Sequence, residues 1–300
     1  MKKRTYYIKD NRTAYLMIMP FFLFFTLFVV YPIGANFFYS FTNYDLSSSR
    51  AFTGLANYSA LLRDGDFLRS VYNTALYALL SVVPLTLMGF AAAALVNSRL
   101  ARRSNTAKAI SVLFTFPYVT SMIAVSMIWL LLYEPTGGVF NKILMSAGIS
   151  PQRWLFNENQ ALLCLVAMNI WKHIGYVMVI YLGGLQTIPR QLYESASIDG
   201  ASDIKCFFKI TVPMISHITF FINITLWIEA FKTFDQIRVM TGGGPVNSTT
   251  TIVHQIYISS FTEFKYGYAS AMSVILFILT SVVILLNFKT AAGKRQLEQK

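Results

Sequence analysis

Long apolar runs separated by shorter polar stretches dominate the chain. A bilayer-spanning α-helix needs about 20 predominantly apolar residues. Six runs reach that length, and they lie at 14–40, 72–97, 107–133, 161–187, 212–236 and 267–288. Pro and Gly within the runs are compatible with spanning helices, because neighbouring helices can satisfy the backbone groups that these residues free. The pattern therefore predicts an all-α, polytopic membrane protein with six transmembrane helices.

The distribution of Lys and Arg predicts the orientation of these helices. If the N-terminus is cytoplasmic, the inside segments carry sixteen of the 25 basic residues and the outside loops carry seven. Cytoplasmic loops hold the excess of Lys and Arg in membrane proteins. We therefore expect both termini in the cytoplasm, with an N-terminal segment at 1–13, a transmembrane domain at 14–288 and a tail at 289–300.

The composition agrees with this class and narrows the partners. Apolar residues make up 55% of the chain and charged residues 13%, well below the roughly 25% charged residues of soluble domains. The net charge of +12 could suggest nucleic acid, but in so hydrophobic a chain it indicates charge-biased loops beside the lipid bilayer, so no nucleic-acid partner is expected. Two cysteines and three scattered histidines predict neither a disulfide framework nor a metal site.

One polar segment differs from the rest of the chain. Residues 188–213 read IPRQLYESASIDGASDIKCFFKITVP, and the predicted topology places them in the cytoplasm. Pro189 can open a short helix and Gly200 can close it. The small residues around this turn would let the backbone of another protein approach closely. We interpret the 188–213 segment as a docking surface for a partner protein.

Charged residues also occur at membrane depth, where they are costly and usually face a bundle interior or a water-filled path. Lys172 and His173 lie in the fourth run, and Glu229, Lys232 and Asp235 lie in the fifth. The last three recur at i, i+3 and i+6, so on one helix they would share a face and could pair. Two interpretations are open: a structural ion-pair ladder near the outer interface, or the lining of a path for a polar substrate.

The sequence holds no recognisable catalytic motif. It has no G-x-x-x-x-G-K-[ST], and the Gly-Gly-Gly-Pro at 242–245 lacks the Lys-Ser/Thr of a phosphate loop, so it predicts a bend after a helix. The run Asp199-Gly200-Ala201 faintly resembles membrane phosphotransferases, but only Asp203 follows where further metal-binding aspartates are needed. The chain is therefore not expected to be an enzyme. If it works with ATP, another subunit must bind the ATP.

The 188–213 segment resembles the cytoplasmic coupling loop of ABC importer permeases. That loop has the pattern E-A-A-x-x-D-G-A followed by an aromatic residue, an Ile and a Pro. The residues that fit it are Glu194, Ala196, Asp199, Gly200, Ala201, Phe207, Ile210 and Pro213, with Ser195 where Ala is usual. Further stretches that resemble carbohydrate-uptake permeases lie at 117–144, 169–189, 231–245 and 261–277. The chain is identified as a member of the maltose-importer-like, binding-protein-dependent family, and it resembles the first-type permease subunit.

The resemblance implies the type I ABC importer permease fold in the cell membrane of a prokaryote. It also implies three kinds of partner: a second homologous permease subunit, two ABC ATPase subunits and an extracytoplasmic solute-binding protein. ATP and Mg²⁺ would bind to the ATPase subunits, and no cofactor is expected on this chain. The residues implied to couple it to an ATPase are Glu194, Ser195, Ala196, Asp199, Gly200, Ala201 and Phe207.

Matching the maltose-importer pattern position by position implies a set of residues along the substrate path. They are Tyr118, Met122, Asn169, Lys172, His173, Tyr176, Phe231 and Lys232. The expected cargo is a sugar or oligosaccharide. Two lysines and a histidine near the path would favour an acidic saccharide, and glycerol phosphate or another polar solute is an alternative on the same fold. An alternative from another class is an ion-coupled secondary transporter with Glu229 and Asp235 as a relay, which would need no ATPase.

Overall fold

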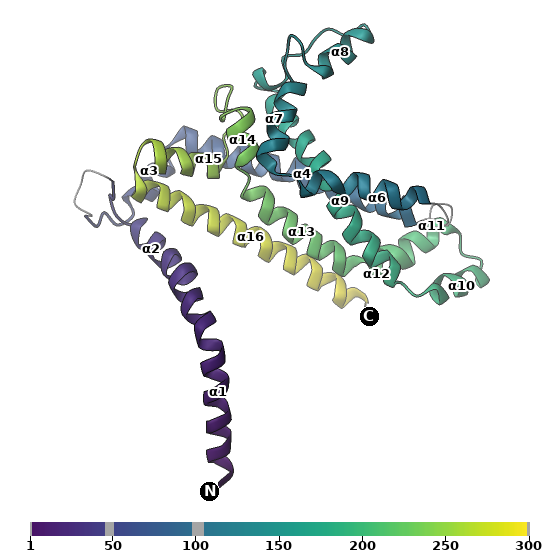
Figure 1. Ribbon diagram of the computed structural model, residues 1–300, viewed down its shortest axis with the longest axis horizontal. Coiled ribbons are helices and arrows are strands. Elements are labelled where there is room, and N and C mark those ends of the chain that lie inside the picture. Colours follow the sequence, from purple (N-terminus) through teal and green to yellow (C-terminus); the bar gives the residue numbers. More distant parts are fainter. Residues whose placement is uncertain (1, 46–50, 98–104, 299–300) are drawn as a thin grey trace. The chain divides into compact units, whose positions relative to one another are not determined.

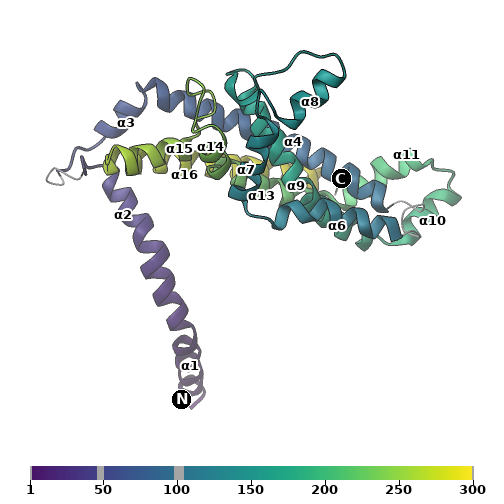
Figure 2. The ribbon, with the colours of Figure 1, turned by 45° about the horizontal axis from the view of Figure 1, so that its top comes forward.

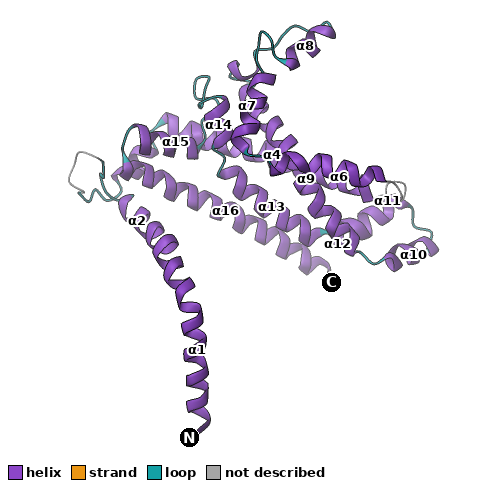
Figure 3. Cartoon of the chain, viewed as in Figure 1, coloured by secondary structure: helices purple, strands orange, loops and turns teal. Residues whose placement is uncertain are grey.

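The computed structural model describes residues 2–45, 51–97 and 105–298, and most of this part is helical (Figure 3). In the described part, strand-like pairing is limited to one bridge between Thr42 and Phe52. The chain divides into two compact units, one formed by Met1–Arg63 with Ile256–Ile275 and the other by Asp64–Gln255 with Leu276–Lys300. Each unit is described by itself.

The first unit is built on an apolar helix that extends from Arg12 to Tyr39. Its parts are α1 (Lys2–Phe25), the π-helical turn η1 (Thr26–Val30) and α2 (Tyr31–Tyr39). Pro32 lies inside this continuous helix, directly after the π-helical turn η1, so the hydrogen bond that it cannot donate falls where the regular helical pattern is already interrupted. The helix is exposed on every side along 12–34, which is the pattern of a membrane span. The unit also holds α3 (Ala56–Leu61), η4 (Ile258–Thr262) and the start of α16 (Tyr266–Glu298).

The second unit is centred on α9 (Ala161–Thr187), which packs against α4 (Gly65–Asn97), α6 (Asn105–Val119) and α13 (Ser216–Phe231) (Figures 1 and 2). Within its apolar window, 61% of α9 is buried, compared with 28% for α4. The remaining helices of the unit are α7 (Met122–Leu132), α8 (Val139–Ser146), η2 (Trp154–Phe156), α10 (Arg190–Ile198), α11 (Asp203–Cys206), η3 (Phe207–Thr211), α12 (Val212–Met214), α14 (Asp235–Met240), α15 (Ile252–Tyr257), which continues into the first unit, and the later part of α16.

Glycines in two helices permit the close approach of their neighbours. A Cβ at Gly175 in α9 would overlap the backbone carbonyl group of Phe114 in α6. A Cβ at Gly89 in α4 would overlap the Val177 side chain, whose Cβ would lie only 2.8 Å away. Small residues at helix contacts let backbones pack closely in membranes, where van der Waals contact drives helix association. These positions therefore fix how near α4 and α6 come to α9.

The predicted spans are present, but two of them are broken. Four helices in the described chain are long and apolar enough to cross a membrane, and the number is six if each bent pair forms one span. The predicted span over 107–133 is a bent pair, since α6 and α7 meet at 105°. Ser121 between them is extended, with φ −58° and ψ 137°. The available signal was Pro117 in the last turn of α6, because sharp kinks lie almost always at Pro or at one of a few other features.

The predicted helix over 212–236 also differs from the structure. It bends by 61° after Met214, and α13 then ends at Phe231 with Lys232 as its C-cap. Phe234 leaves the helical region with φ −146°, and a new helix, α14, begins at Asp235. The Thr233 carbonyl accepts a hydrogen bond from Thr251 Oγ1 at 3.1 Å, so a tertiary contact replaces the helical one. The expectation that Glu229, Lys232 and Asp235 share one helix face is therefore wrong.

Part of the basis for the predicted orientation lies outside the described residues. The structure does not describe residues 1, 46–50, 98–104 and 299–300, which include Arg50, Arg99, Arg102, Arg103 and Lys300. The backbone of 289–298 continues α16.

Candidate functional site

The 188–213 segment forms two short helices joined by a tight turn, as its sequence predicts. Pro189 is the N-cap of α10, and Gly200 has the positive φ of +72° that glycine adopts without strain. The Ala201 N–H donates to the Ala196 carbonyl at 2.9 Å, which satisfies a helix-end carbonyl as glycine C-caps commonly do. Ser202 then accepts a hydrogen bond from the backbone N–H of Lys205 and caps α11.

This segment has an exposed face and an anchored face. The predicted coupling residues Glu194, Ser195, Asp199 and Gly200 are exposed, and Ala196 and Ala201 are half-buried. Beside them, Ile198 is 87% exposed and Ile204 is 72% exposed, so the tip of the segment carries apolar surface. The anchored face meets the spans through the predicted coupling residue Phe207, which stacks on Phe90 of α4. Within the segment, Tyr193 and Thr211 share a hydrogen bond of 2.8 Å that ties α10 to η3. The segment is thus fixed to the span bundle while its tip is uncovered in the single chain.

Lys172 occupies the break between α6 and α7. It is only 4% exposed, and Nζ donates hydrogen bonds to the carbonyls of Pro117 at 3.0 Å, Tyr118 at 3.1 Å and Thr120 at 2.6 Å. The last carbonyls of a helix lack intrahelical partners and carry partial negative charge. Lys172 on α9 therefore stabilises the broken end of α6, and an ammonium group has no further N–H to offer a substrate.

Aromatic rings surround this break. The rings of Tyr118 and Tyr176 stack with centroids 4.4 Å apart, and His173 meets Tyr118 edge-on at 5.7 Å. His173 Nδ1 also lies 2.9 Å from the carbonyl oxygen of Asn169, one turn earlier in α9. The cluster places His173 between the break and the neighbouring cavity.

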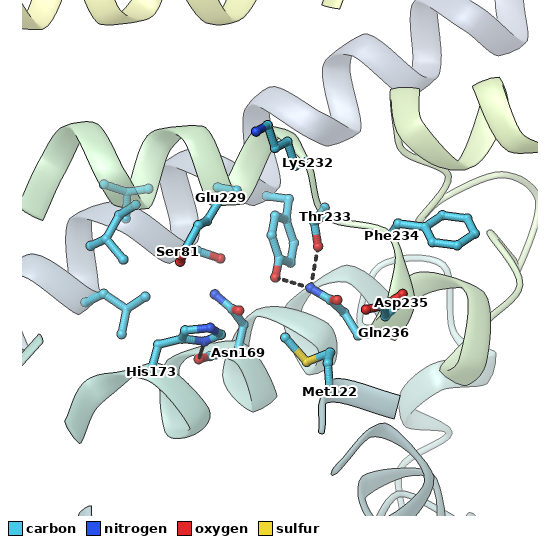
Figure 4. Close-up of a pocket in the computed structure, with 15 residues that line it drawn as sticks. Ser81, Met122, Asn169, His173, Glu229, Lys232, Thr233, Phe234, Asp235 and Gln236 are labelled. Atoms are coloured by element: carbon cyan, nitrogen blue, oxygen red, sulfur yellow. Dashed lines mark hydrogen bonds between the residues drawn. The ribbon is translucent and has the colours of Figure 1, made fainter. Parts of the chain in front are cut away.

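A cavity of about 310 Å³ opens beside His173, between α4, α7, α9 and the α13–α14 junction (Figure 4). Ligand pockets typically measure ~300–1,000 Å³. The polar residues of its lining are Tyr77, Ser81, Asn169, His173, Glu229, Lys232, Thr233, Asp235 and Gln236. The apolar residues are Val82, Leu85, Met122, Leu226, Ala230 and Phe234.

Hydrogen bonds fix one wall of the cavity. Gln236 Nε2 donates to the hydroxyl of Tyr77 at 2.8 Å and also contacts Thr233 Oγ1, so α14 is tied to α4. In Figure 4 Glu229, Ser81, Asn169 and His173 approach one another, whereas the Lys232 ammonium group points away from them. In the described chain no ion pair within 4.0 Å joins Glu229, Lys232 and Asp235; the ion pair found there is Lys265–Glu263 at 3.1 Å. The ladder interpretation is therefore not supported.

The predicted path residues lie in four different places. Met122, Asn169, His173 and Lys232 line the cavity. Tyr118 and Tyr176 stack beside it, and Lys172 stabilises the break. Phe231 is buried against Trp227, with ring centroids 6.1 Å apart. Their roles toward a substrate stay predictions.

Sequence reasoning missed the contribution of the second span. Ser70, the adjacent pair Asn73 and Thr74, Tyr77 and Ser81 follow one another at steps of three to four residues on α4, and all are buried. This polar stripe at helical spacing in an apolar run was the available signal. Tyr77 and Ser81 line the cavity. Asn73 and Thr74 donate or accept hydrogen bonds at the loop over 241–251 and at the start of α15.

The loop over 241–251 is built on this stripe. Asn73 donates from its side-chain amide to the carbonyls of Asn247 at 2.8 Å and Thr250 at 3.0 Å. Gly242 and Gly243 take positive φ values of +58° and +91°. The predicted bend at Gly-Gly-Gly-Pro is thus present directly after α14.

His254 lies beneath this loop and is 2% exposed. Burial, and then the positive charge of Arg238, lower the pKa of His254 below its usual 6.5. Neither of its ring nitrogens has a hydrogen-bond partner in the described chain. The neutral imidazole is therefore the form that this site favours.

Comparisons with known proteins place the chain in a family. Residues 4–297 match the family model described as binding-protein-dependent transport system inner membrane component. The chain is 33% identical to the probable ABC transporter permease protein YurN of Bacillus subtilis, over 92% of this chain and 94% of that one. It is 31% identical to the trehalose/maltose transport system permease protein MalF of Thermococcus litoralis, over 96% of both chains. It is 32% identical to the sn-glycerol-3-phosphate transport system permease protein UgpA of Yersinia pestis, over 93% of this chain and 94% of that one.

The fold is that of a solved importer. A chain of a bacterial ABC transporter involved in the import of the acidic polysaccharide alginate superposes with a TM-score of 0.85 at 22% identity, covering 97% of this chain and 99% of that one. The fold is therefore the type I ABC importer permease fold, in a multi-pass membrane protein. The chain belongs to the family of inner membrane components of binding-protein-dependent transport systems, which are the permease subunits of ABC importers.

Proposed function

We propose that this chain is the first-type permease of a saccharide importer and forms the transport path together with a second, homologous permease. One observation carries the proposal: the second unit combines an open polar cavity among its spans with an exposed segment whose Phe207 stacks on Phe90 of α4. The cavity would hold the cargo. The segment would bind an ATPase subunit, whose movement would change the conformation of the spans.

Two ABC ATPase subunits would drive this conformational change, and the 188–213 segment would bind one of them in the cytoplasm. Glu194 through Ala201, with Ile198 and Ile204, would seat in an ATPase groove. The Tyr193–Thr211 hydrogen bond ties α10 to the rest of the segment, and Phe207 stacks on α4, so a displacement of the segment would move the spans as a rigid body. ATP and Mg²⁺ would bind to the ATPase subunits, and this chain would bind no cofactor.

The opposite ends of the spans would meet an extracytoplasmic solute-binding protein. A solved relative of this fold, at 23% identity, is an alginate ABC transporter in complex with an alginate pentasaccharide-bound periplasmic protein. In this chain the loop over 241–251 and α8 would form the surface for such a partner. Both termini would then lie in the cytoplasm.

The names of the relatives leave two classes of cargo open, saccharides and glycerol phosphate. Permeases for trehalose/maltose and for sn-glycerol 3-phosphate are nearly equally similar to this chain, at 31% and 32% identity. The cavity offers amide, hydroxyl and carboxylate groups beside apolar surface, and this combination suits the hydroxyl groups and ring faces of a saccharide. We therefore assign a saccharide cargo.

Copurification and transport test this function together. The chain, purified from its native membrane, should copurify with a second permease and an ATPase. In proteoliposomes the complex should hydrolyse ATP faster when its binding protein is added, and it should import solute only with ATP. A chain that purifies without an ATPase and accumulates solute from an ion gradient alone would instead be a secondary transporter.

A further inference from the structure

A buried hydrogen bond links the loop over 241–251 to the break between α13 and α14. Thr251, the last residue of the loop, donates from Oγ1 to the carbonyl oxygen of Thr233 at 3.1 Å. Thr251 is 0% exposed and Thr233 is 6% exposed. A hydrogen bond in such surroundings is stronger than one in water. The position of Thr251 therefore fixes the backbone at the break.

The link continues from the break to the second span. Gln236 Nε2 contacts Thr233 Oγ1 and also donates to the Tyr77 hydroxyl at 2.8 Å. Thr233, Gln236 and Tyr77 all line the cavity (Figure 4). They are buried, as is Thr251, so none of the four moves without breaking a hydrogen bond or opening a void. One chain of contacts thus runs from the end of the loop along a wall of the cavity.

The tip of the same loop lies at the surface. Val246 is 78% exposed and has φ +48°, a left-handed conformation that is rare for a β-branched residue. Asn247 follows with φ +55°, and its side-chain amide donates to Asp66 Oδ1 at 2.8 Å. Residues in such conformations persist only where the surrounding structure holds them, and they cluster at functional sites. The tip is therefore an uncovered surface with a fixed conformation.

We propose that the Thr251–Thr233 hydrogen bond couples this loop to the cavity, so that a partner seated on the tip moves the wall that Thr233 and Gln236 form. Thr251 is then a positioning residue for transport. The inference rests on the proposed function, which supplies the solute-binding protein as the partner. Hinges are a few element-terminal residues that absorb changes in backbone angles. The break is such a place, since Phe234 lies between two helices with φ −146° and ψ −56°.

The accessibility of the cavity measures this coupling. The complete importer is reconstituted with Cys164→Ser, Cys206→Ser and Met122→Cys, because both native cysteines are free and Met122 lines the cavity from α7, outside the link. A charged, water-soluble thiol reagent labels the introduced thiol. A saturating concentration of the binding protein should change the labelling rate about fivefold or more, which is the lower end of common allosteric coupling.

Variants of two buried threonines test the role of the link. Thr251→Val keeps the shape of the side chain and removes its hydroxyl, so the binding protein should change the labelling rate less than about twofold. Thr251→Ser should restore the response. Thr249→Val is the matched control: Thr249 is also 0% exposed, but its hydroxyl bonds within the loop, to Gly244 and Thr241, so the response should persist. A full response in Thr251→Val, or its loss in Thr249→Val, would overturn the inference.

A second variant separates the link from the cap of α15. Thr251 Oγ1 also accepts a hydrogen bond from the His254 N–H at 3.4 Å, and Thr251→Val removes this cap. Tyr77→Phe opens the link at α4 and leaves α15 intact, so it should reduce the labelling response in the same way. A full response in Tyr77→Phe would assign the effect to α15 and overturn the inference.

The parent complex distinguishes failure of the inference from failure of the proposed function. Stimulated ATP hydrolysis without any change in labelling would overturn the inference alone. If the binding protein changes neither ATP hydrolysis nor labelling, the proposed function fails with it.

Discussion

The ammonium group of Lys172 donates a hydrogen bond to the carbonyl oxygen of Thr120 at 2.6 Å, across the contact between α9 and the broken third span. Two more bonds from the same nitrogen reach Pro117 and Tyr118. From the sequence, the positive charge of Lys172 suggested an acidic cargo, but in the structure its partners are these three carbonyls. Lys172 therefore stabilises the break between α6 and α7.

Lys172→Met should destabilise this break. It removes three hydrogen bonds from a charged, buried donor, at a cost of about 3 kcal/mol. The carbonyls of Tyr118 and Thr120 lose this donor, while the Pro117 carbonyl keeps the hydrogen bond from the Thr120 hydroxyl at 2.6 Å. Thermal unfolding of the purified complex should show a lower Tm, and import should be lost. Lys142→Met, at an exposed lysine of α8, is the control for stability and should keep the wild-type Tm. Equal Tm values for the two variants would contradict the stabilising role of Lys172.

Gly175→Ala should weaken the packing of α6 on α9. The added Cβ meets the Phe114 carbonyl, and backbone atoms cannot move aside as a side chain can. Gly183→Ala on the same helix adds a Cβ with nothing within 4 Å, so it should keep or raise stability by up to ~1 kcal/mol through helix propensity. The two Tm values, measured in the same detergent, should therefore change in opposite directions. A stable Gly175→Ala protein would show that α6 can shift away from α9 at little cost.

Gly200→Asp should uncouple transport without unfolding the chain. Nothing lies within 4 Å of a Cβ at Gly200, and Asp tolerates a positive φ better than most residues, so the damage falls on the docking face. Uptake and stimulated ATP hydrolysis should both be lost. Gly54→Asp is a matched control, with φ +60° and equally open space before α3, and it should transport normally. Normal stimulated turnover in Gly200→Asp would refute the coupling role of the segment.

Asn73→Asp should release the loop over 241–251. The new carboxylate would face two carbonyl oxygens where the amide donated to both, which costs about 2 kcal/mol. Limited proteolysis should cut the loop faster than in wild type, and ATP hydrolysis should respond less to the binding protein. The exposed Asn159→Asp serves as control. An unchanged cleavage rate in Asn73→Asp would mean that the glycines and threonines of the loop suffice to hold it.

His254 should make stability depend on pH. Its pKa in the folded chain lies below 6.5, because burial and then Arg238 disfavour the charged ring. The unfolded chain thus takes up the proton first as pH falls, so the full stability is present above about pH 6.5 and declines below it, by at most ~1.4 kcal/mol per pH unit. Tm should drop between pH 7.5 and 5.5 in wild type, and the drop should be smaller in His254→Gln. The exposed His217→Gln should retain the wild-type drop; an identical drop in all three proteins would assign it to other groups.

Much of the fold and some of the site could be predicted from the chain alone. Runs of about 20 apolar residues define spanning helices without knowledge of their neighbours, because the bilayer sets the length. The turn at Gly200 and the helix start after Pro189 are local, since each depends on the allowed backbone angles of one residue. The family followed from motifs that include these same residues.

Only the tertiary structure decided what the charged groups at membrane depth do. The apolar pattern is continuous through Ser121 and Phe234, so the two breaks could not be seen as interruptions in it. They are stabilised by groups distant in sequence, Lys172 in one case and Thr251 in the other. Because hydrogen bonds between helices, and not helix propensity, hold these breaks, the sequence by itself determined the spans and the turn, and the packing of the spans decided which charges line the cavity.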